Sequence, residues 1–523
     1  MSNESARQLA IDAFAGIKVV PTSLITYRSA GMVIAIGEQQ QLELCDQLPE
    51  GISIQRIASG AAGLRIEVSG HLGAFEIRIE DGQGKISTHK ADAVLDLHQT
   101  ALLQRDMLPP GYFHLTADSW DAVALGEELQ ELAGEFEKPR YFEYDASICA
   151  HGVNGKIACR QCIDACPAEA ITSLVERIQV DPFLCQGGGS CAAVCPSGAI
   201  TYAYPGIRDQ GKRLKKMLQV YHAEGGRQAM VLFHPQSVSV EDYCATHDNL
   251  LAIEVEELGS VGMELCLSAL AYGASQVLLL VDDQVAPLSR KQMEAQLDWV
   301  KALITGLGLD PARISSFSNP DAIPACDATQ VIEAAIHDMP DDKRNAIFQA
   351  LDHIVNCLKP AQPVVDLPRP APFGEAVIDA QKCTLCMACV GACPGRALQD
   401  GSNRAVPEVF FLENKCLQCN ACVLTCPEDA IVLKPRMLFD HELRNRARSL
   451  NSDTPFACIG CGKPFAPTSV IAKMQDKLKD HYMFANQRAL DRLKMCEDCR
   501  VVDIVDDPEA LGGQFDALRN FRD

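Results

Sequence analysis

Hydrophobic and polar residues alternate along two short stretches near the start of the chain. Residues 64–70 (LRIEVSG) and 74–80 (AFEIRIE) place an apolar side chain at every second position, which predicts strands with one buried face. Residues 81–84 (DGQG) have the composition of a turn, and residues 122–137 indicate a short acidic helix. These elements predict an α+β domain over residues 1–140, without a catalytic constellation.

The pattern changes between residues 206 and 360. Continuous apolar runs at 229–234, 250–255 and 277–281 alternate with helix-like stretches at 262–273 and 289–306. Apolar strands separated by helices predict an α/β domain with a parallel sheet covered on both faces.

Polar residues follow the predicted strands of that sheet. The carboxyl ends of such strands are where ligands bind, although solvated loop charges explain the same pattern. The domain has neither a G-x-G-x-x-G motif nor a P-loop. The residues concerned are His234, Glu256, Glu257, Asp282 and Asp283.

An internal repeat organises the cysteines. Four segments, at 159–171, 185–200, 386–398 and 419–431, each contain Cys-Pro followed by a short apolar turn. They form two pairs, which predicts two duplicated modules at 141–205 and 374–435. These modules flank the α/β domain at 206–360. A proline-rich segment at 361–373 is expected to be a stiff linker, and a tail at 436–523 follows.

Composition limits the kind of protein that this can be. The start of the chain lacks a basic region followed by an apolar one, and no apolar run approaches membrane-spanning length, so we expect a cytoplasmic protein without an integral membrane segment. In such a chain, 24 cysteines indicate metal or redox chemistry rather than disulfides. The formal charge of −22 argues against nucleic acid and favours redox protein partners with basic patches.

The second module follows the spacing C-x2-C-x2-C-x3-C-P twice. Three cysteines at this spacing wrap one face of a cubane cluster, and the fourth reaches the neighbouring cluster. The spacing therefore predicts two [4Fe–4S] clusters with crossed ligands. One set is Cys383, Cys386, Cys389 and Cys426, and the other is Cys416, Cys419, Cys422 and Cys393.

The first module is irregular. Lys156 stands at the first position of its first motif, so we expect Cys149 to replace it, with residues 150–158 looping out. Crossing then predicts a four-cysteine site from Cys149, Cys159, Cys162 and Cys195. In the second motif Gly188 stands at the second position, which leaves a three-cysteine site from Cys185, Cys191 and Cys166.

The three-cysteine site leaves the nuclearity of its cluster open. We expect a [3Fe–4S] cluster there. The alternative is a [4Fe–4S] cluster with an open iron or a non-cysteine ligand such as Ser190. The chain is thus expected to hold three [4Fe–4S] clusters and a fourth cluster of either kind.

The tail carries two further C-x2-C pairs. Four thiolates suit tetrahedral zinc, so we expect a zinc-ribbon-like segment; a further iron–sulfur centre and metal-free thiols are the alternatives. The expected ligands are Cys458, Cys461, Cys496 and Cys499.

Five cysteines stand outside these motifs. Lone cysteines usually act as small buried hydrophobes, and we expect that role here, with a redox role for Cys266 as the alternative. The five are Cys45, Cys244, Cys266, Cys326 and Cys357.

The cysteine groups resemble two bacterial dicluster ferredoxins, one of them altered. The phrases FEKPRYFEYDASICAH, PFACIGCGKPFA and MCEDCRV, in this order, resemble a family of proteobacterial polyferredoxins that are often encoded beside formate dehydrogenases. The resemblance implies cytoplasmic electron transfer linked to formate metabolism. That family has a cysteine where this chain has Gly188.

A second resemblance lies in the α/β domain. Residues 250–283, with GMELCLSALAYGASQVLLLVDD, are similar to the delta subunit of methyl-viologen-reducing hydrogenases, which implies a docking fold. The favoured function is a multi-cluster electron relay, more a carrier than a catalyst. The alternatives are an oxidoreductase subunit with a flavin or substrate site in the α/β domain, and a formate dehydrogenase maturation factor.

Overall fold

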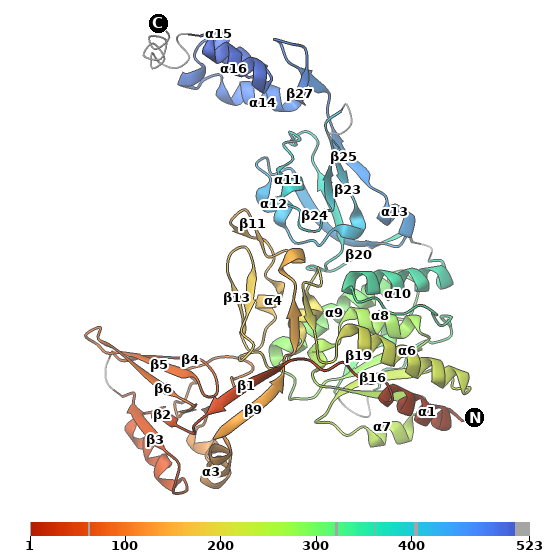
Figure 1. Ribbon diagram of the computed structural model, residues 1–523. Coiled ribbons are helices and arrows are strands. Elements are labelled where there is room, and N and C mark those ends of the chain that lie inside the picture. The colour runs from red at the N-terminus through yellow and green to blue at the C-terminus, as the bar shows by residue number, and fades with distance from the viewer. Residues whose placement is uncertain (1, 61–62, 319–322, 361, 402–405, 508–523) are drawn as a thin grey trace. The chain divides into compact units, whose positions relative to one another are not determined.

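The computed structural model describes residues 2–60, 63–318, 323–360, 362–401 and 406–507 (Figure 1). The chain divides into two compact units. The first comprises residues 1–151 and 160–362, and the second comprises residues 152–159 and 363–523. In the described part of the chain, no helix is both long enough and apolar enough to cross a membrane.

The described part of the N-terminal domain contains three sheets, the smallest of which is the pair of β1 (Leu24–Ser29) and β9 (Gly134–Pro139). The turn predicted at residues 81–84 is confirmed, because the backbone amide of Gly84 donates a hydrogen bond to Asp81 O at 2.9 Å. The two predicted strands are confirmed as well. They belong to an antiparallel sheet of β4 (Arg65–Ser69), β5 (Phe75–Glu80) and β6 (Ile86–Ala91). A second, parallel sheet has the order β3-β2-β7-β8. Its strands are β2 (Val33–Gly37), β3 (Ile54–Ala58), β7 (Ala93–Asp96) and β8 (Tyr112–His114), and helix α2 (Gln39–Leu42) follows β2.

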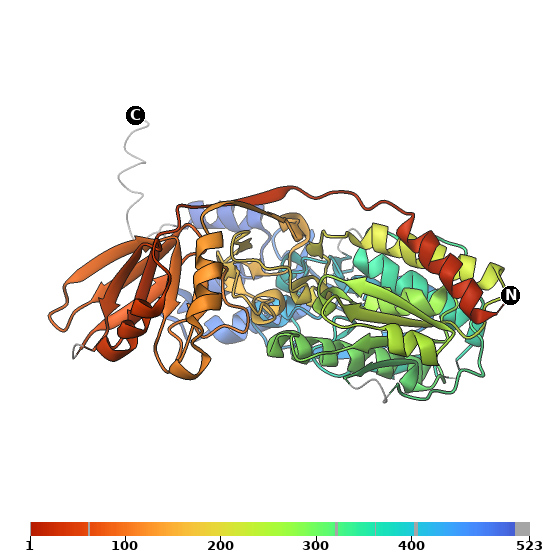
Figure 2. The same cartoon turned by 90° about the horizontal axis from the view of Figure 1, so that it is seen from below.

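Two expectations for this region were wrong. The acidic helix ends early, as α3 (Ala122–Glu131), and residues 134–139 form β9 (Gly134–Pro139), which pairs with β1 (Leu24–Ser29). Gly134 has φ +149°, a conformation that stops the helix. Helix α1 (Asn3–Ala15) packs against α6 (Ile207–Ala223) of the α/β domain, not within the domain predicted for residues 1–140 (Figure 2).

The α/β domain confirms the predicted parallel sheet. Its strand order is β17-β16-β18-β19. The strands are β16 (Met230–Pro235), β17 (Leu250–Val255), β18 (Gln276–Leu280) and β19 (Ile314–Phe317). The two predicted helices are α8 (Met263–Ala271) and α9 (Pro287–Gly306). A short α7 (Glu241–Thr246) precedes β17, and α10 (Lys343–Leu358), which the pattern did not reveal, packs on α8.

The first cysteine module contains short elements. β10 (Phe142–Tyr144) pairs with β15 (Ile200–Tyr202), and β13 (Ile171–Ser173) pairs with β14 (Ile178–Val180). The helices are α4 (Gln161–Asp164) and α5 (Ser190–Val194).

The second unit holds the second cysteine module and the tail. One sheet has the order β20-β24-β21, with β20 (Val364–Asp366), β21 (Gly374–Ile378) and β24 (Ile431–Leu438). The other has the order β22-β23-β25, with β22 (Leu398–Asp400), β23 (Glu408–Phe411) and β25 (Arg448–Ser452). The helices of this module are α11 (Ala388–Gly391), α12 (Ala421–Thr425) and α13 (His441–Asn445).

Strand pairing moves two predicted boundaries. Part of the expected linker at 361–373 is strand β20, which is hydrogen-bonded to β24. The module extends past residue 435, because β25 completes its second sheet. Glu413, 4 % exposed, holds the two sheets together through Arg436 at 2.8 Å and Arg448. The rest of the tail contains β26 (Pro455–Ala457), β27 (Pro464–Pro467), α14 (Thr468–Leu478), α15 (Gln487–Arg492) and α16 (Glu497–Val505).

Candidate metal centres

The four Cys-Pro turns share one backbone geometry. The third residue after each cysteine has a left-handed conformation, with φ between 47° and 74°; these residues are Glu169, Gly198, Arg396 and Asp429. In three copies the next amide donates to the cysteine sulfur: Ala170 to Cys166 at 3.3 Å, Ala397 to Cys393 at 3.2 Å and Ala430 to Cys426 at 3.4 Å. Such bonds favour the thiolate form of the cysteine and adjust the reduction potential of a bound cluster.

The fourth copy of the turn differs in its hydrogen bonds. Ser197 Oγ lies 3.7 Å from the sulfur of Cys195, and the amide of Ala199 donates to that hydroxyl instead. The predicted repeat is therefore visible in the backbone, but one thiol has a different partner.

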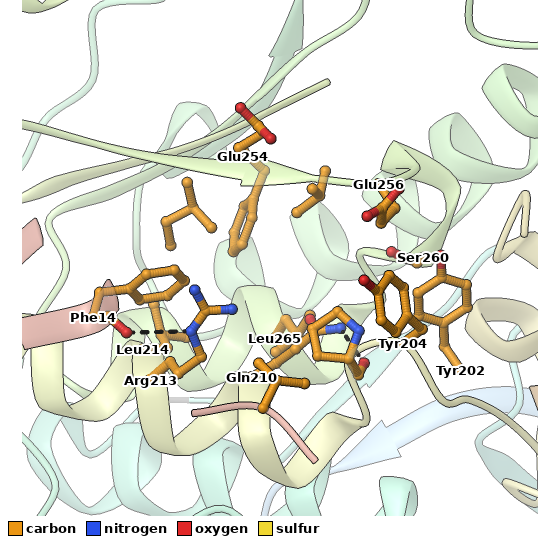
Figure 3. A pocket seen from close by; sticks show the side chains of 15 residues that line it. Phe14, Tyr202, Tyr204, Gln210, Arg213, Leu214, Glu254, Glu256, Ser260 and Leu265 are labelled. Atoms are coloured by element: carbon orange, nitrogen blue, oxygen red, sulfur yellow. Dashed lines mark hydrogen bonds between the residues drawn. The ribbon is translucent and has the colours of Figure 1, made fainter. Parts of the chain in front are cut away.

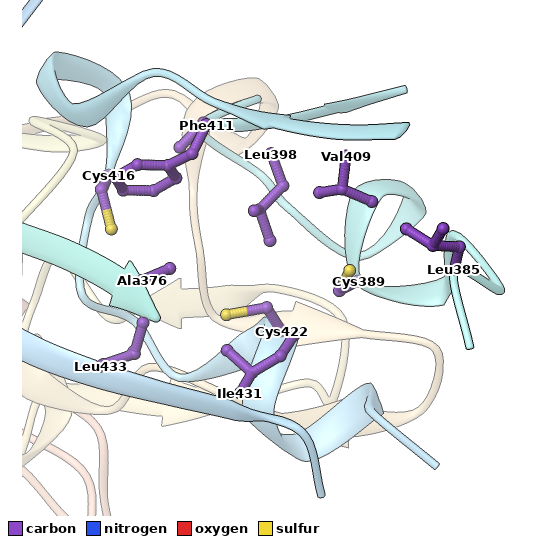
Figure 4. Close-up of a cluster of buried hydrophobic side chains, with 11 residues drawn as sticks. Ala376, Leu385, Cys389, Leu398, Val409, Phe411, Cys416, Cys422, Ile431 and Leu433 are labelled. Carbon is purple, nitrogen blue, oxygen red and sulfur yellow. The ribbon is translucent and has the colours of Figure 1, made fainter. Parts of the chain in front are cut away.

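Six of the eight thiols of the second module belong to or pack against one apolar core, in which Figure 4 shows Cys389, Cys416 and Cys422, whereas Cys386 is exposed. Burial, followed by the neighbouring thiols Cys383, Cys386 and Cys426, raises the pKa of Cys389 to about 12. Thiols with such pKa values ionise only beside a cation. The iron atoms of a cluster supply that charge, so the donor set fits a cluster.

A second group of thiols forms within the same module. Burial raises the pKa of Cys422 most, and the thiols of Cys416, Cys419, Cys393 and Cys389 contribute next, in that order. The thiols that raise the pKa of Cys389 all belong to its predicted set, whereas Cys422 is also influenced by Cys389, which the spacing assigns to the other set.

The wrap of the cysteine loops can be followed in residues with positive φ. Left-handed residues flank the second cysteine of both motifs in the second module and flank Gly188 in the first. The three pairs are Leu385 and Met387, Gln418 and Asn420, and Gly187 and Gly189. Gly188 therefore stands in a loop with the backbone of a ligand loop, but it has no thiol.

The first module brings six of its seven predicted ligands into one packed core. Burial raises the pKa of Cys191 well above its usual value, and Cys166 and Cys185 contribute next. The six are Cys149, Cys162, Cys166, Cys185, Cys191 and Cys195.

The insertion between Cys149 and Cys159 forms a hairpin. Its strands are β11 (Gly152–Val153) and β12 (Lys156–Ile157). Residues 152–159, and with them Cys159, are grouped with the second unit. Lys156, which occupies the first motif position, uses its Nζ to donate to Leu424 O at 2.7 Å.

The first module is docked on the α/β domain through residues that the motif analysis missed. Lys343 Nζ donates to the carbonyl oxygens of Ala192 and Ala193, and Arg344 donates to Pro196 O at 3.1 Å. The only sequence signal was a basic pair after Asp342, which caps α10.

The four tail cysteines converge. The sulfurs of Cys458, Cys461, Cys496 and Cys499 all lie within 4.8 Å of one another. The amides of Cys496 and Gly460 donate to Cys458 Sγ at 3.2 and 3.4 Å, and these bonds, that of Cys496 first, lower the pKa of Cys458 to about 6. A Cβ at Gly460 would lie 3.2 Å from Cys499 Sγ. A compact thiolate group of this kind fits one tetrahedral metal ion.

The five lone cysteines do not all behave alike. Cys45 and Cys266 are buried, Cys244 and Cys326 are half-buried, and burial raises the pKa of Cys266 to about 12, which disfavours a redox role. Cys357 is exposed, so the expectation of a buried hydrophobe was wrong there. It lies on α10, with its sulfur 3.7 Å from His353 Nε2.

A cavity of about 190 Å³ lies beside the carboxyl ends of β16 and β17. Figure 3 shows Phe14 and Arg213 at one end and Tyr202 and Tyr204 at the other. The Arg213 guanidinium stacks 3.8 Å from the Phe14 ring and donates to Phe14 O. Two carboxylates, Glu254 and Glu256, also line the cavity.

The polar residues predicted at strand ends do lie at the carboxyl ends of these parallel strands. Ser237 Oγ donates to Asp282 at 2.6 Å, and His234 Nδ1 lies 3.0 Å from Pro235 O. Burial, followed by Glu256 and Asp282, raises the pKa of Glu257 to about 7.

Comparison with known proteins identifies both cysteine modules. Residues 157–199 and residues 382–431 each match a protein family described as a 4Fe-4S dicluster domain. The search of curated proteins returned no match to the chain. The protein therefore contains two 4Fe–4S dicluster domains, separated by a parallel-sheet α/β domain.

Proposed function

We propose that the protein is a multi-cluster electron carrier that relays electrons between redox partners through four clusters. The observation that carries the proposal is the match of residues 157–199 and 382–431 to 4Fe-4S dicluster domains. Paired clusters of this kind pass single electrons at low potential, and burial and sulfur hydrogen bonds adjust that potential.

The proposed ligands are those that the spacing assigns. In the second module they are Cys383, Cys386, Cys389 and Cys426 for one cluster, and Cys416, Cys419, Cys422 and Cys393 for the other. In the first module they are Cys149, Cys159, Cys162 and Cys195 for one, and Cys185, Cys191 and Cys166 for the other. The tail cysteines are proposed to hold one structural zinc ion.

An electron count tests this function. The chain, purified and reconstituted without oxygen, should accept about four electrons, one per cluster, in a reductive titration. A variant in which two ligands of each cluster of the second module are changed to alanine (Cys383, Cys386, Cys416 and Cys419) should lose the signals of that module and accept about two. An iron-loaded protein that takes up no electrons, or one that oxidises formate without a partner, would overturn the proposal.

The partner is proposed from sequence likeness and charge. The phrases shared with polyferredoxins encoded beside formate dehydrogenases make a cytoplasmic formate dehydrogenase, or a related oxidoreductase, the candidate. The net charge of −22 favours a partner with a basic docking face, so capture should weaken as salt rises. Anaerobic capture of a formate dehydrogenase on the tagged chain at low salt tests this, and equal capture at high salt contradicts charge-guided docking.

The aromatic cavity favours one other candidate function, an oxidoreductase subunit with a flavin in the α/β domain. Tyr202, Tyr204 and Phe14 could line a planar ligand. Acid extraction of the purified protein and fluorescence of the extract decide between the two, because a stoichiometric flavin would make the protein more than a carrier.

A further inference from the structure

A sulfur atom from another domain stands beside the gap at Gly188. The side-chain sulfur of Met107 lies 3.4 Å from the point where a Cβ at position 188 would stand, and a ring carbon of Pro167 lies 3.2 Å from it. A cysteine side chain at position 188 would begin at that point. The space next to the missing thiol is therefore occupied by a thioether.

Met107 is held in this place by the backbone. It lies between β7 and β8 of the N-terminal domain, and its amide donates to Pro167 O at 3.0 Å, in the Cys-Pro turn of the same proposed site. Its side chain packs into the core that contains Cys166, Cys185 and Cys191. The contact thus joins the loop between β7 and β8 of the N-terminal domain to the three-cysteine site.

We infer that Met107 is the fourth protein ligand of the cluster held by Cys166, Cys185 and Cys191. A thioether is a soft donor of the kind that suits iron–sulfur clusters. It is neutral, so the site keeps one negative charge fewer than a four-thiolate site, which raises its reduction potential. The inference rests on the proposed function and replaces the expected three-iron cluster with a four-iron cluster of unusual ligation.

Ser190, the other candidate ligand, is engaged elsewhere. Its side chain is 1 % exposed, and its Oγ lies 3.1 Å from Ser289 Oγ and 3.4 Å from Gly188 O. A Cβ at Gly259 would lie 2.6 Å from the same Oγ. Ser190 therefore faces the α/β domain, whereas the sulfur of Met107 lies beside the gap.

Removal of the thioether tests the inference. Anaerobic wild type should contain about sixteen irons per chain and show no [3Fe–4S] signal when oxidised. Met107→Leu keeps the shape of the side chain but has no donor, so it should lose about one iron and show that signal. Met32→Leu, which removes an exposed methionine of the same domain, should match wild type.

Two further variants guard against a folding defect. Met107→Cys restores a donor and should keep about sixteen irons. Gly188→Cys with Met107→Ala places a thiolate at the regular position and relieves the close contact, so it should also lack the three-iron signal. In selenomethionine-labelled protein, X-ray absorption at the selenium edge should reveal an iron neighbour that Met107→Leu lacks.

The outcomes separate this inference from the proposed function. If wild type takes up electrons but already shows the full [3Fe–4S] signal, or if Met107→Leu keeps the iron count and spectrum of wild type, Met107 is not a ligand and the carrier function stands. If wild type holds no clusters, the proposed function itself fails.

Discussion

Lys343 Nζ donates a hydrogen bond to the carbonyl oxygen of Ala192 at 2.7 Å. A lysine of the α/β domain therefore caps the C-terminal end of helix α5, which directly precedes Cys195. Lys343 is 6 % exposed, and its Nζ lies 3.9 Å from a carboxylate oxygen of Glu264. The last carbonyls of a helix lack partners within it and attract positive charge. The α/β domain therefore places the buried Lys343 side chain next to the helix that contains Cys191, a proposed cluster ligand.

We predict that Lys343→Met lowers the midpoint potential of the first module. Loss of a nearby positive charge favours the more positive, oxidised cluster, by on the order of tens of millivolts. Anaerobic redox titration followed by paramagnetic resonance measures the shift. Lys291→Met, on the exposed side of α9, is the control, and equal shifts in both variants would show that Lys343 does not act through its position.

The crossed ligation of the second module predicts how much iron each of two double substitutions should remove. Cys386→Ala with Cys426→Ala removes two ligands of one proposed cluster and should cost about four irons. Cys386→Ala with Cys393→Ala leaves three cysteines at each cluster and should cost about two irons, one from each cluster. Iron analysis after anaerobic reconstitution compares the two. The reverse order would mean that each motif binds its own cluster without crossing.

The tail is predicted to bind one zinc ion per chain. Cys458→Ser with Cys461→Ser removes two of four converging thiolates and should abolish zinc in elemental analysis, with cluster iron unchanged. Cys357→Ser, which replaces an exposed lone cysteine, should keep the metal. A loss of about four irons in place of zinc would identify the tail site as a fifth cluster.

Glu257 predicts a pH dependence of stability. Its pKa is raised to about 7, first by burial, so its protonated form favours the fold. This contribution is complete below its unfolded pKa and is lost as pH rises through about 7. Glu257→Gln should therefore be as stable as wild type near pH 4.5 and more stable by about 2 kcal/mol above pH 7.5.

Urea unfolding followed by the fluorescence of Trp299, buried in the α/β domain, measures the pH effect. Glu294→Gln changes an exposed residue of α9, and its free energy of unfolding should follow that of wild type at every pH. A stability difference for Glu257→Gln that does not vary with pH would show that Glu257 does not titrate in this range.

The cluster motifs and the parallel sheet could be predicted from the amino-acid sequence alone. Cys383, Cys386 and Cys389 lie within seven residues of one another, so their spacing dictates a local wrap whatever the rest of the chain does. The strands at 230–235, 250–255 and 276–280 are mostly buried and mostly apolar, so each can be found without its neighbours.

Tertiary structure decided the contacts between distant residues. Met107 stands 81 positions before Gly188, and Lys343 stands 151 positions after Ala192, and a periodic pattern carries no information about such pairs. The same holds for the packing of α1 on α6 and the pairing of β20 with β24. The sequence of each segment alone does not reveal which distant element it contacts. Spacing along the chain reports local geometry, whereas the surroundings of each cluster depend on which domains pack against it.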